Sequence, residues 1–408
     1  MKILPSLFLT FCFLSDLMAQ GFQVNLQGQK QQAMGSAACA TIQDASSLFY
    51  NPGSTCFLPK NSIMAGVSTT FGRTAFQDSA TNSISRTESP VGTPFTFYSA
   101  FAVKDSSSRM KMGIGIYTPF GSGIKWEDGW TGRFALTSIK LLSIFIQPTF
   151  SYRINDKIGI GAGFIFATGS VTLKKDIPVI DADGNYANAT LQGSANGSGF
   201  NAGIYYKPNN KLSLGLSYRS QVNMNVDNGK AEFQVPSALA ANFPNGAFSS
   251  SLPLPSVFTA GFALTLKEKF MIAGDINYVG WSAYKALEFD YEKNTPSLID
   301  THSERNYKNT FAFRAGVQYK KDEKIFLRGG LSYVITPVQP GYVTPETPDA
   351  TRLNIAGGFS YIINKKIAVD ASFTYQRLKR ADTNLETQLS GTFKTFVYIP
   401  GFGLVYTL

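Results

Sequence analysis

The feature that most constrains this chain is a pattern that repeats from about residue 60 onward. A segment that alternates between apolar and polar residues is followed by a very short polar turn, a second alternating segment and a long loop. Alternation with a period of two is typical of a β-strand with one apolar face. Fourteen such strands are predicted, near residues 60–75, 95–103, 110–118, 139–153, 157–173, 199–207, 211–226, 256–266, 269–280, 308–320, 324–335, 351–363, 366–378 and 391–408.

The connections between these strands fall into two classes. Six are brief polar turns, which begin near residues 104, 154, 208, 267, 321 and 364, while the seven others mostly run from 12 to about 30 residues. An even strand number with short turns at one end and long loops at the other is the architecture of outer-membrane barrels. We therefore predict an all-β fold, a 14-stranded antiparallel transmembrane β-barrel in the bacterial outer membrane.

The two faces of the predicted strands agree with a barrel in lipid. In the strand from residue 211, Leu212, Leu214 and Leu216 share one face, and Ser213 and Arg219 share the other. A basic side chain against lipid at mid-depth costs about 2–4 kcal/mol, so the charged faces are expected to point into the lumen. The same argument places five further polar side chains inside: Asp275, Asn277, Arg328, Arg352 and Asp370.

Composition excludes several other classes of protein. Charged residues make up 16% of the 408-residue chain, apolar residues 44%, and there are 33 Phe, 19 Tyr and 37 Gly, which is not the composition of a disordered chain. Outside the first twenty residues no apolar run approaches the roughly 18 residues of a membrane helix. The net charge of +10 is dispersed without a basic run, which argues against nucleic acid as a partner and favours outer-membrane lipid, including lipopolysaccharide.

The N-terminus has the order of a secretory signal. Lys2 precedes an apolar stretch over residues 3–14, and Ala19 provides a small residue for cleavage. We expect residues 1–19 to be a cleaved signal peptide. Cys39 and Cys56 remain in the exported chain, where a disulfide is permitted but their spacing does not decide it.

Residues 20–58 are predicted to form a plug, or hatch, inside a barrel made by residues 59–408. This segment is rich in small residues and lacks the hairpin pattern. About eight strands is the largest barrel that side chains alone can fill, so fourteen strands need further material in the lumen. Gly159, Gly161 and Gly163 share one face of the fifth strand and are interpreted as clearance for the hatch backbone.

Several separated sequence stretches, in one order, resemble a known family. They are GFQVNLQG at 21–28, QDASSLFYNPG at 43–53, TPFGSGIKWEDGWTGRF at 118–134, LPLPSVFTAGF at 252–262, DINYVGWSAY at 275–284 and TPVQPGYVTPETPDATR at 336–352. These stretches resemble the FadL-like outer-membrane transporters of long-chain fatty acids and aromatic hydrocarbons. The resemblance implies loop capture of a hydrophobic compound, binding in an internal pocket, hatch movement and lateral exit through the barrel wall.

The resemblance also implies roles for two short segments. Asn51, Pro52 and Gly53 fall on the family's Asn-Pro-Ala hatch motif, with glycine in place of alanine. Pro119, Phe120 and Gly121 interrupt the third strand, where the family's wall has an inward kink, and are expected to form the lateral opening. An ordinary turn and an ordinary strand end are the alternative interpretations of these two segments.

Ligand-binding residues are expected in one loop and on one strand. The loop at 227–255 is apolar and helix-tolerant, and Leu239, Phe243, Phe248 and Leu252 are expected to form the capture groove, or else to pack loop against loop. By the resemblance, Lys308 lies where the family has a lysine near a bound carboxylate. A partner arginine is missing near residues 168–170, and Arg314 is either a substitute or part of a structural salt bridge with Asp275 or another inward carboxylate.

The predicted function is therefore uptake of hydrophobic compounds, with long-chain fatty acids favoured over aromatic hydrocarbons or alkanes, and no cofactor. A general hydrophilic porin and an adhesin or structural barrel are the non-enzymatic alternatives. An enzyme is not expected, because the sole histidine, His302, lies beside Ser303 in a long loop and no metal-spaced cluster or paired carboxylates are present. We expect the barrel to act as a monomer.

Overall fold

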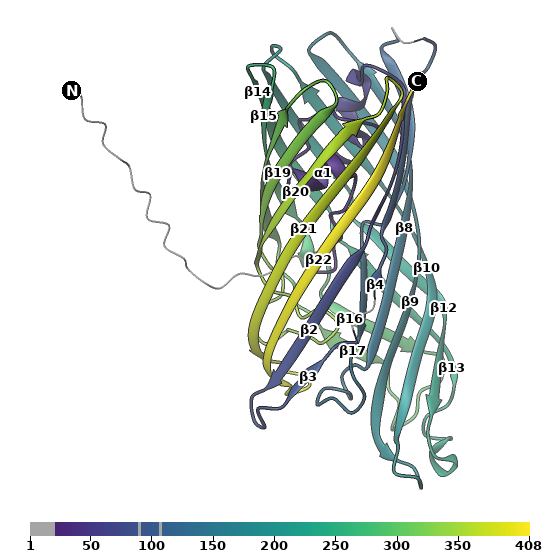
Figure 1. The fold of residues 1–408 in the computed structure, drawn as a ribbon. Coiled ribbons are helices and arrows are strands. Elements are labelled where there is room, and N and C mark those ends of the chain that lie inside the picture. The colour runs from purple at the N-terminus through teal and green to yellow at the C-terminus, as the bar shows by residue number, and fades with distance from the viewer. Residues whose placement is uncertain (1–20, 89–90, 106–107) are drawn as a thin grey trace, which may run out of the picture.

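A computed structural model describes residues 21–88, 91–105 and 108–408, so the predicted signal peptide lies outside the described residues. The described chain forms one closed, elongated barrel with the start of the chain packed inside it (Figure 1). The hatch contains α1 (Gln29–Ala33), α2 (Ser47–Tyr50) and the 3-10 helix η1 (Pro52–Phe57). Two further 3-10 helices, η2 (Ser237–Leu239) and η3 (Trp281–Ala283), lie in long loops. In the described part of the chain, no helix is long and apolar enough to cross a membrane.

The strands are all antiparallel to their neighbours. They are β1 (Ser62–Ser68), β2 (Thr70–Asp78), β3 (Ile84–Arg86), β4 (Val91–Gly92), β5 (Phe95–Ala102), β6 (Met110–Tyr117), β7 (Gly121–Lys125), β8 (Ser138–Arg153), β9 (Ile158–Ile180), β10 (Tyr186–Tyr206), β11 (Leu212–Arg219), β12 (Val222–Gln234), β13 (Gly246–Leu254), β14 (Val257–Leu266), β15 (Phe270–Val279), β16 (Ala286–Tyr291), β17 (Thr301–Glu304), β18 (Thr310–Lys320), β19 (Ile325–Val334), β20 (Arg352–Ile362), β21 (Ile367–Thr383) and β22 (Ser390–Thr407).

These segments make fourteen passes along the barrel, because several passes are interrupted. The first pass is β1 with β2, the second β3 to β5, the third β6 with β7, the seventh β11 with β12 and the eighth β13 with β14. The barrel closes where β22 pairs with both β1 and β2, for example Ser62 opposite Thr407 and Phe71 opposite Tyr398. The predicted 14-stranded antiparallel barrel is confirmed.

The inward and outward faces follow the predicted alternation. Leu214 and Leu216 are exposed on the outside, whereas Ser217 and Arg219 are buried inside. Asp275, Asn277 and Asp370 are also buried in the lumen. The prediction that charged side chains avoid the lipid face at mid-depth is confirmed for these positions.

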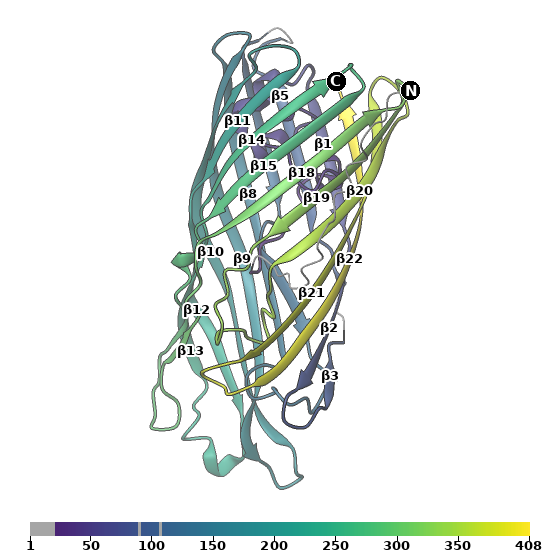
Figure 2. The ribbon, with the colours of Figure 1, turned by 90° about the vertical axis from the view of Figure 1, so that its left-hand side faces the viewer.

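Several of the long loops differ from the prediction, and two of them differ most. Residues 174–198, expected to be a loop, continue the strands β9 and β10 into one long hairpin with a turn at 181–185. Residues 227–255, expected to be helix-tolerant, form the β12–β13 hairpin, with only the short η2 at its tip. Both hairpins reach beyond the neighbouring strands at the long-loop end of the barrel (Figure 2). Each hairpin continues an existing ladder, so its backbone groups are paired between strands.

The hatch lies in the half of the lumen nearer the short turns (Figure 1). Lys30 forms ion pairs with Asp44 of the hatch at 3.3 Å and with Asp370 of β21 at 3.9 Å. Cys39 and Cys56 are both buried and free, and no disulfide joins them. The N-terminal segment is thus held inside the barrel by polar contacts to the wall.

Candidate functional site

The Asn51-Pro52-Gly53 segment ties the hatch to the strands β9 and β10. The Asn51 side-chain amide donates to the Cys39 carbonyl at 2.9 Å and to the Ile204 carbonyl at 3.0 Å, and its oxygen accepts from the Gly53 N–H at 3.0 Å. Asn51 is fully buried. Its three hydrogen bonds hold the turn that starts η1 and fasten this turn to the wall.

Glycines allow this close approach of two backbones. A Cβ on Gly53 would lie 2.6 Å from the Gly203 carbonyl oxygen, and a Cβ on Gly161 would lie 2.4 Å from the Pro52 oxygen. The predicted clearance is confirmed for Gly159 and Gly161, whereas a Cβ on Gly163 would meet the side chains of Thr149 and Asn201. Position 53 therefore requires glycine because a side chain there would collide with the wall. It does not require the additional backbone conformations that glycine can adopt.

The third pass of the barrel is broken at Thr118–Phe120, between β6 and β7. At this break the hatch takes the position of a neighbouring strand. The Val24 N–H donates to the Pro119 carbonyl at 2.7 Å, the Gly121 N–H donates to the Phe22 carbonyl at 3.1 Å, and Gln23 forms a β-bridge with Phe120. Beyond the break β7 pairs with β8, and in the described chain it is linked to the second pass by a bridge from Thr87 to Trp126 and by the ion pair of Lys125 with Glu88.

Phe22 is the centre of an aromatic cluster beside this wall break. Its ring centroid lies 6.1 Å from that of Phe120, 5.1 Å from Trp281 and 5.8 Å from Tyr284. Tyr307 packs on both Trp281 and Tyr284, at 5.7 and 5.1 Å. Edge-to-face contacts of this kind hold the Phe22 ring firmly in place.

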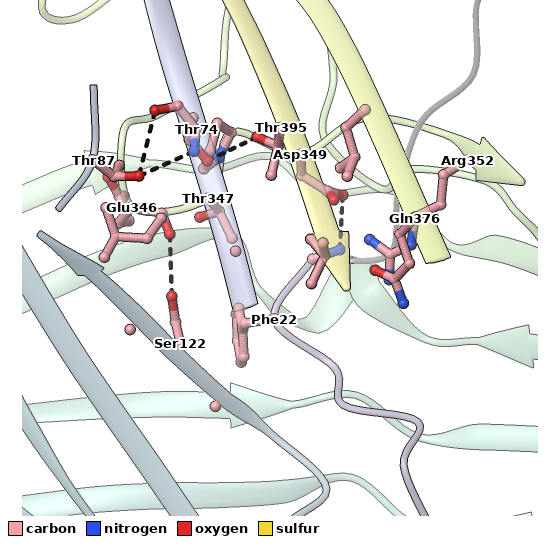
Figure 3. Close-up of a pocket in the computed structure, with 18 residues that line it drawn as sticks. Phe22, Thr74, Thr87, Ser122, Glu346, Thr347, Asp349, Arg352, Gln376 and Thr395 are labelled. Carbon is pink, nitrogen blue, oxygen red and sulfur yellow. Dashed lines mark hydrogen bonds between the residues drawn. The ribbon is translucent and has the colours of Figure 1, made fainter. Parts of the chain in front are cut away.

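Two cavities meet at Phe22. The apolar cavity, of about 80 Å³, is lined mainly by side chains of β8, β9, β12, β13 and β16, among them Leu141, Val171, Met224, Leu254 and Phe289. The polar cavity, of about 190 Å³, is lined by Thr74, Asp349, Arg352, Gln376 and Thr395 and is drawn in Figure 3. Phe22, Ser122, Glu346 and Thr347 line both cavities. These four residues are the partition between the two spaces.

Polar contacts fix the partition to the loops. The Asp349 carboxylate accepts the Gly21 N–H and the Thr336 hydroxyl, both at 2.7 Å. Burial raises the pKa of Asp349 to about 6, against the opposing effects of Arg352 and of these donors. Glu346 forms an ion pair with Arg305 at 2.8 Å. The start of the described hatch is therefore bound to the same loop that carries Glu346 and Thr347.

The four ligand residues predicted in the 227–255 loop do not all lie at the same place in the structure. Leu252 lines the apolar cavity, and Phe248 is buried against Phe289 with centroids 5.4 Å apart. Phe243 packs on Phe233 at 6.1 Å. Leu239 lies in η2 at the hairpin tip and does not line the apolar cavity.

The two predicted cations do not lie at either cavity of the partition. The Lys308 side chain is exposed just before β18, where its backbone N–H donates to the Pro337 carbonyl. Arg314 is buried beside the hatch and donates to the Asn277 side-chain oxygen at 2.5 Å and to the Gly35 carbonyl at 3.4 Å. The suggested salt bridge of Arg314 with Asp275 is not formed; the Asp275 carboxylate instead accepts the backbone N–H groups of Ala38 and Cys39, at 2.7 and 2.9 Å.

Sequence reasoning missed the aromatic partition itself. Phe22, Trp281 and Tyr284 stand in stretches that carried the resemblance, but no role was assigned to them. The available signal was the concentration of aromatic residues in those stretches. His302, in contrast, contacts Glu288 at 2.7 Å, and the Ser303 hydroxyl donates to Glu386, so the two neighbours do not face each other as a nucleophile and its base.

Comparisons with known proteins agree with this architecture. Residues 11–406 match the family model described as outer membrane protein transport protein (OMPP1/FadL/TodX). An outer membrane protein of Neisseria meningitidis serogroup B is 26% identical over 90% of this chain and 88% of its own length. A long-chain fatty acid transport protein of Escherichia coli O6:H1 is 22% identical over 64% of this chain and 65% of its own length.

A solved structure shares the fold. The toluene transporter TodX of Pseudomonas putida superposes with a TM-score of 0.74 at 16% identity, covering 93% of this chain and 97% of that one. At this identity the likeness shows the fold and nothing finer.

Proposed function

The chain belongs to the outer membrane protein transport protein family (OMPP1/FadL/TodX), and on this premise we propose how it moves a hydrophobic small molecule across the outer membrane. The family is one of transporters, which confirms the expectation that the chain is not an enzyme. The proposed route starts in the apolar cavity, passes the partition at Phe22 and leaves laterally through the wall break at Pro119–Gly121. The barrel acts as a monomer.

The observation that carries this proposal is the position of Phe22. One face of this side chain lines the apolar cavity, and its backbone occupies the wall break by bonding to Gly121. Withdrawal of residues 22–24 would thus join the two cavities and free the backbone groups of Pro119 and Gly121 in one movement. Asn51, Pro52 and Gly53 would anchor the remaining hatch while its start moves.

The chemistry of the apolar cavity favours a neutral substrate. No lysine or arginine is among the described residues that line it, and its one carboxylate, Glu346, is already paired with Arg305. A carboxylate buried here would lack a cationic partner and lie near Glu346, which is costly. We therefore propose a neutral hydrocarbon, aromatic or alkane, in preference to the long-chain fatty acid expected from the sequence, with Phe248 and Leu252 on its path into the cavity.

Uptake by cells that carry no other transporter of this family tests the proposal. Met224→Trp and Ala195→Leu fill the apolar cavity from two different strands, while Phe402→Trp alters an outward ring and serves as the control. We expect both cavity variants to lower the initial rate of toluene uptake by on the order of tenfold and the control to leave it unchanged. Equal amounts of heat-modifiable, folded barrel must be present in each case. Saturable oleate uptake with toluene at background would overturn the proposed substrate class.

A further inference from the structure

Five basic side chains gather on the outer face of the barrel near the long-loop end. We define the basic patch as Arg73 of β2, Arg86 of β3, Arg377 and Lys379 of β21, and Lys394 of β22. Figure 1 shows these four strands side by side on the face toward the viewer. The pairing register makes two rows of the patch: Phe396 lies opposite Arg73 and Arg377, and Lys394 lies opposite Lys379 and Ala75, which in turn lies opposite Arg86.

The charges of the basic patch are not compensated by the protein. All five side chains are exposed, and in the described chain no carboxylate lies within 4.0 Å of any of them. Two other outward lysines of the barrel do have such a partner, Lys125 with Glu88 at 2.6 Å and Lys230 with Glu232. Like charges on facing strands repel, so an external anion would stabilise the patch.

An aromatic surface borders the patch on the side of the short turns. Arg377 and Lys394 lie 5.7 and 5.2 Å from the Phe396 ring centroid. The next outward row consists of Phe71, Tyr398 and Tyr375, and the last two rings are 5.4 Å apart. Beyond this row the exposed side chains are apolar, including Phe373, Phe402 and Leu404.

The dimensions place this border at the edge of the membrane. From Phe396 to Tyr406 the outward residues of β22 are aromatic, apolar or proline, and ten residues of a strand tilted by about 40° rise about 25 Å. That height equals the apolar band of an outer-membrane barrel, about 25 Å. The cations therefore stand just outside the hydrocarbon layer, at the depth of lipid headgroups.

The patch has an edge at β21, and elsewhere in the described barrel the exposed lysines without an ion pair on long strands, Lys140 of β8 and Lys174 of β9, stand on other strands. On β15, β18, β19 and β20 the outward positions, which alternate with the buried ones, carry no charged residue. A general attraction to the anionic membrane surface would not require such clustering. Clustered cations next to an apolar and aromatic surface fit a single molecule with both phosphate groups and acyl chains.

We propose that the basic patch binds the phosphate groups of a phosphorylated glycolipid of the outer leaflet, of the lipopolysaccharide class, whose acyl chains lie on the aromatic surface below. Arginine forks bind phosphate oxygens in pairs, and Arg73 and Arg377 stand on opposite sides of Phe396. Lys379, Lys394 and Arg86 supply further positive charge in the second row. This site is independent of the transport route, because it lies on the opposite side of the wall from both cavities.

Native mass spectrometry of the full-length protein in detergent tests the proposal, with diphosphorylated hexa-acyl lipid A as the probe. The patch variant is Arg377→Gln/Lys379→Gln/Lys394→Gln, and the matched control removes three exposed lysines at the short turns, Lys321→Gln/Lys324→Gln/Lys365→Gln. We expect one lipid A bound to the unaltered protein and to the control, and an affinity lower by on the order of a hundredfold in the patch variant. Arg377→Lys keeps the positive charge, and its affinity for lipid A should fall far less than that of the patch variant.

Two further measurements distinguish binding of a phosphorylated lipid from binding of free phosphate. Inorganic phosphate should not compete at millimolar concentration, and dephosphorylated lipid A should bind as weakly as the patch variant binds the intact lipid. The proposal is overturned if the patch and control variants lose affinity for lipid A equally. It is also overturned if dephosphorylated lipid A binds as tightly as the diphosphorylated probe, or if free phosphate displaces the probe. Heat-modifiability on gels verifies that each variant forms the barrel.

Discussion

At the scale of single residues, a few buried polar side chains hold the hatch to the wall and loops. Asn51 bonds to Cys39 and to Ile204 of β10, while Asp349 accepts the Gly21 N–H at the start of the described hatch. Removing one partner of a buried hydrogen bond costs about 1–3 kcal/mol, because the other partner is left unsatisfied. The two contacts differ in that the one at Asp349 responds to pH.

We expect Asp349→Asn to change how the stability of the barrel depends on pH. Burial raises the pKa of Asp349 to about 6, so the folded state prefers the protonated carboxyl. This contribution to stability is fully present below about pH 4 and is lost as the pH rises through about 6. The apparent melting temperature in detergent should therefore fall between pH 4.5 and 7.5 more in the unaltered protein than in the variant. Parallel curves for the two proteins would contradict the prediction.

Residue patterns predicted some of the site and not the rest. Asn51 and the wall break at Pro119 could be placed, because proline and a small polar residue constrain the backbone locally. The positions of Lys308 and Arg314 could not be predicted, since the exposure of one and the burial of the other depend on loops and hatch that meet only in the folded barrel. The role of Phe22 likewise depends on Trp281 and Tyr284, about 260 residues further along the chain.

At the scale of elements, the hatch and the strands β9 and β10 fit each other through glycines. A Cβ on Gly161 would lie 2.4 Å from the backbone oxygen of Pro52, whereas a Cβ on Gly329 of β19 would have only a methyl group of Val317 at 3.8 Å. A backbone oxygen cannot turn aside as a side chain can. The hatch must therefore shift if a side chain is added at Gly161.

We predict that Gly161→Ala loosens the hatch in an assembled barrel, at a cost of about 1–3 kcal/mol to hatch packing. Liposome swelling with small sugars measures the resulting leak. Gly329→Ala is the matched control and should leave swelling at the level of the unaltered protein. If Gly161→Ala liposomes swell no faster than the control, the hatch does not seal the lumen through this contact.

Alternation in the sequence predicted the strands because lipid and lumen impose opposite polarity on neighbouring residues. It did not predict how far β9, β10, β12 and β13 continue past the membrane. Beyond the lipid that constraint ends, so residues 174–198 and 227–255 resembled loops although their backbones pair. Interruptions such as that between β6 and β7 were visible only where proline marks them.

At the scale of the whole molecule, the described part of the barrel wall is interrupted at Thr118–Phe120, where the hatch lies in place of a neighbouring strand. The hatch lies in the half nearer the short turns, the two cavities that meet at Phe22 lie toward the long loops, and the start of the hatch completes the wall at Phe120. Transport by this account requires a movement of residues 22–24 without unfolding of the barrel. The rest of the hatch stays fastened through Asn51 and the Lys30 ion pairs.

The most direct test is a reversible cross-link between hatch and wall, Gln23→Cys/Phe120→Cys. These residues face each other as a non-hydrogen-bonded antiparallel pair, about 4.5 Å apart between Cα atoms, which suits a disulfide. Toluene uptake should be abolished in the oxidised protein and should return on reduction, with each single-cysteine variant insensitive to oxidant. If the fully cross-linked protein takes up toluene as fast as the same protein after reduction of the disulfide, lateral exit past Phe22 is contradicted.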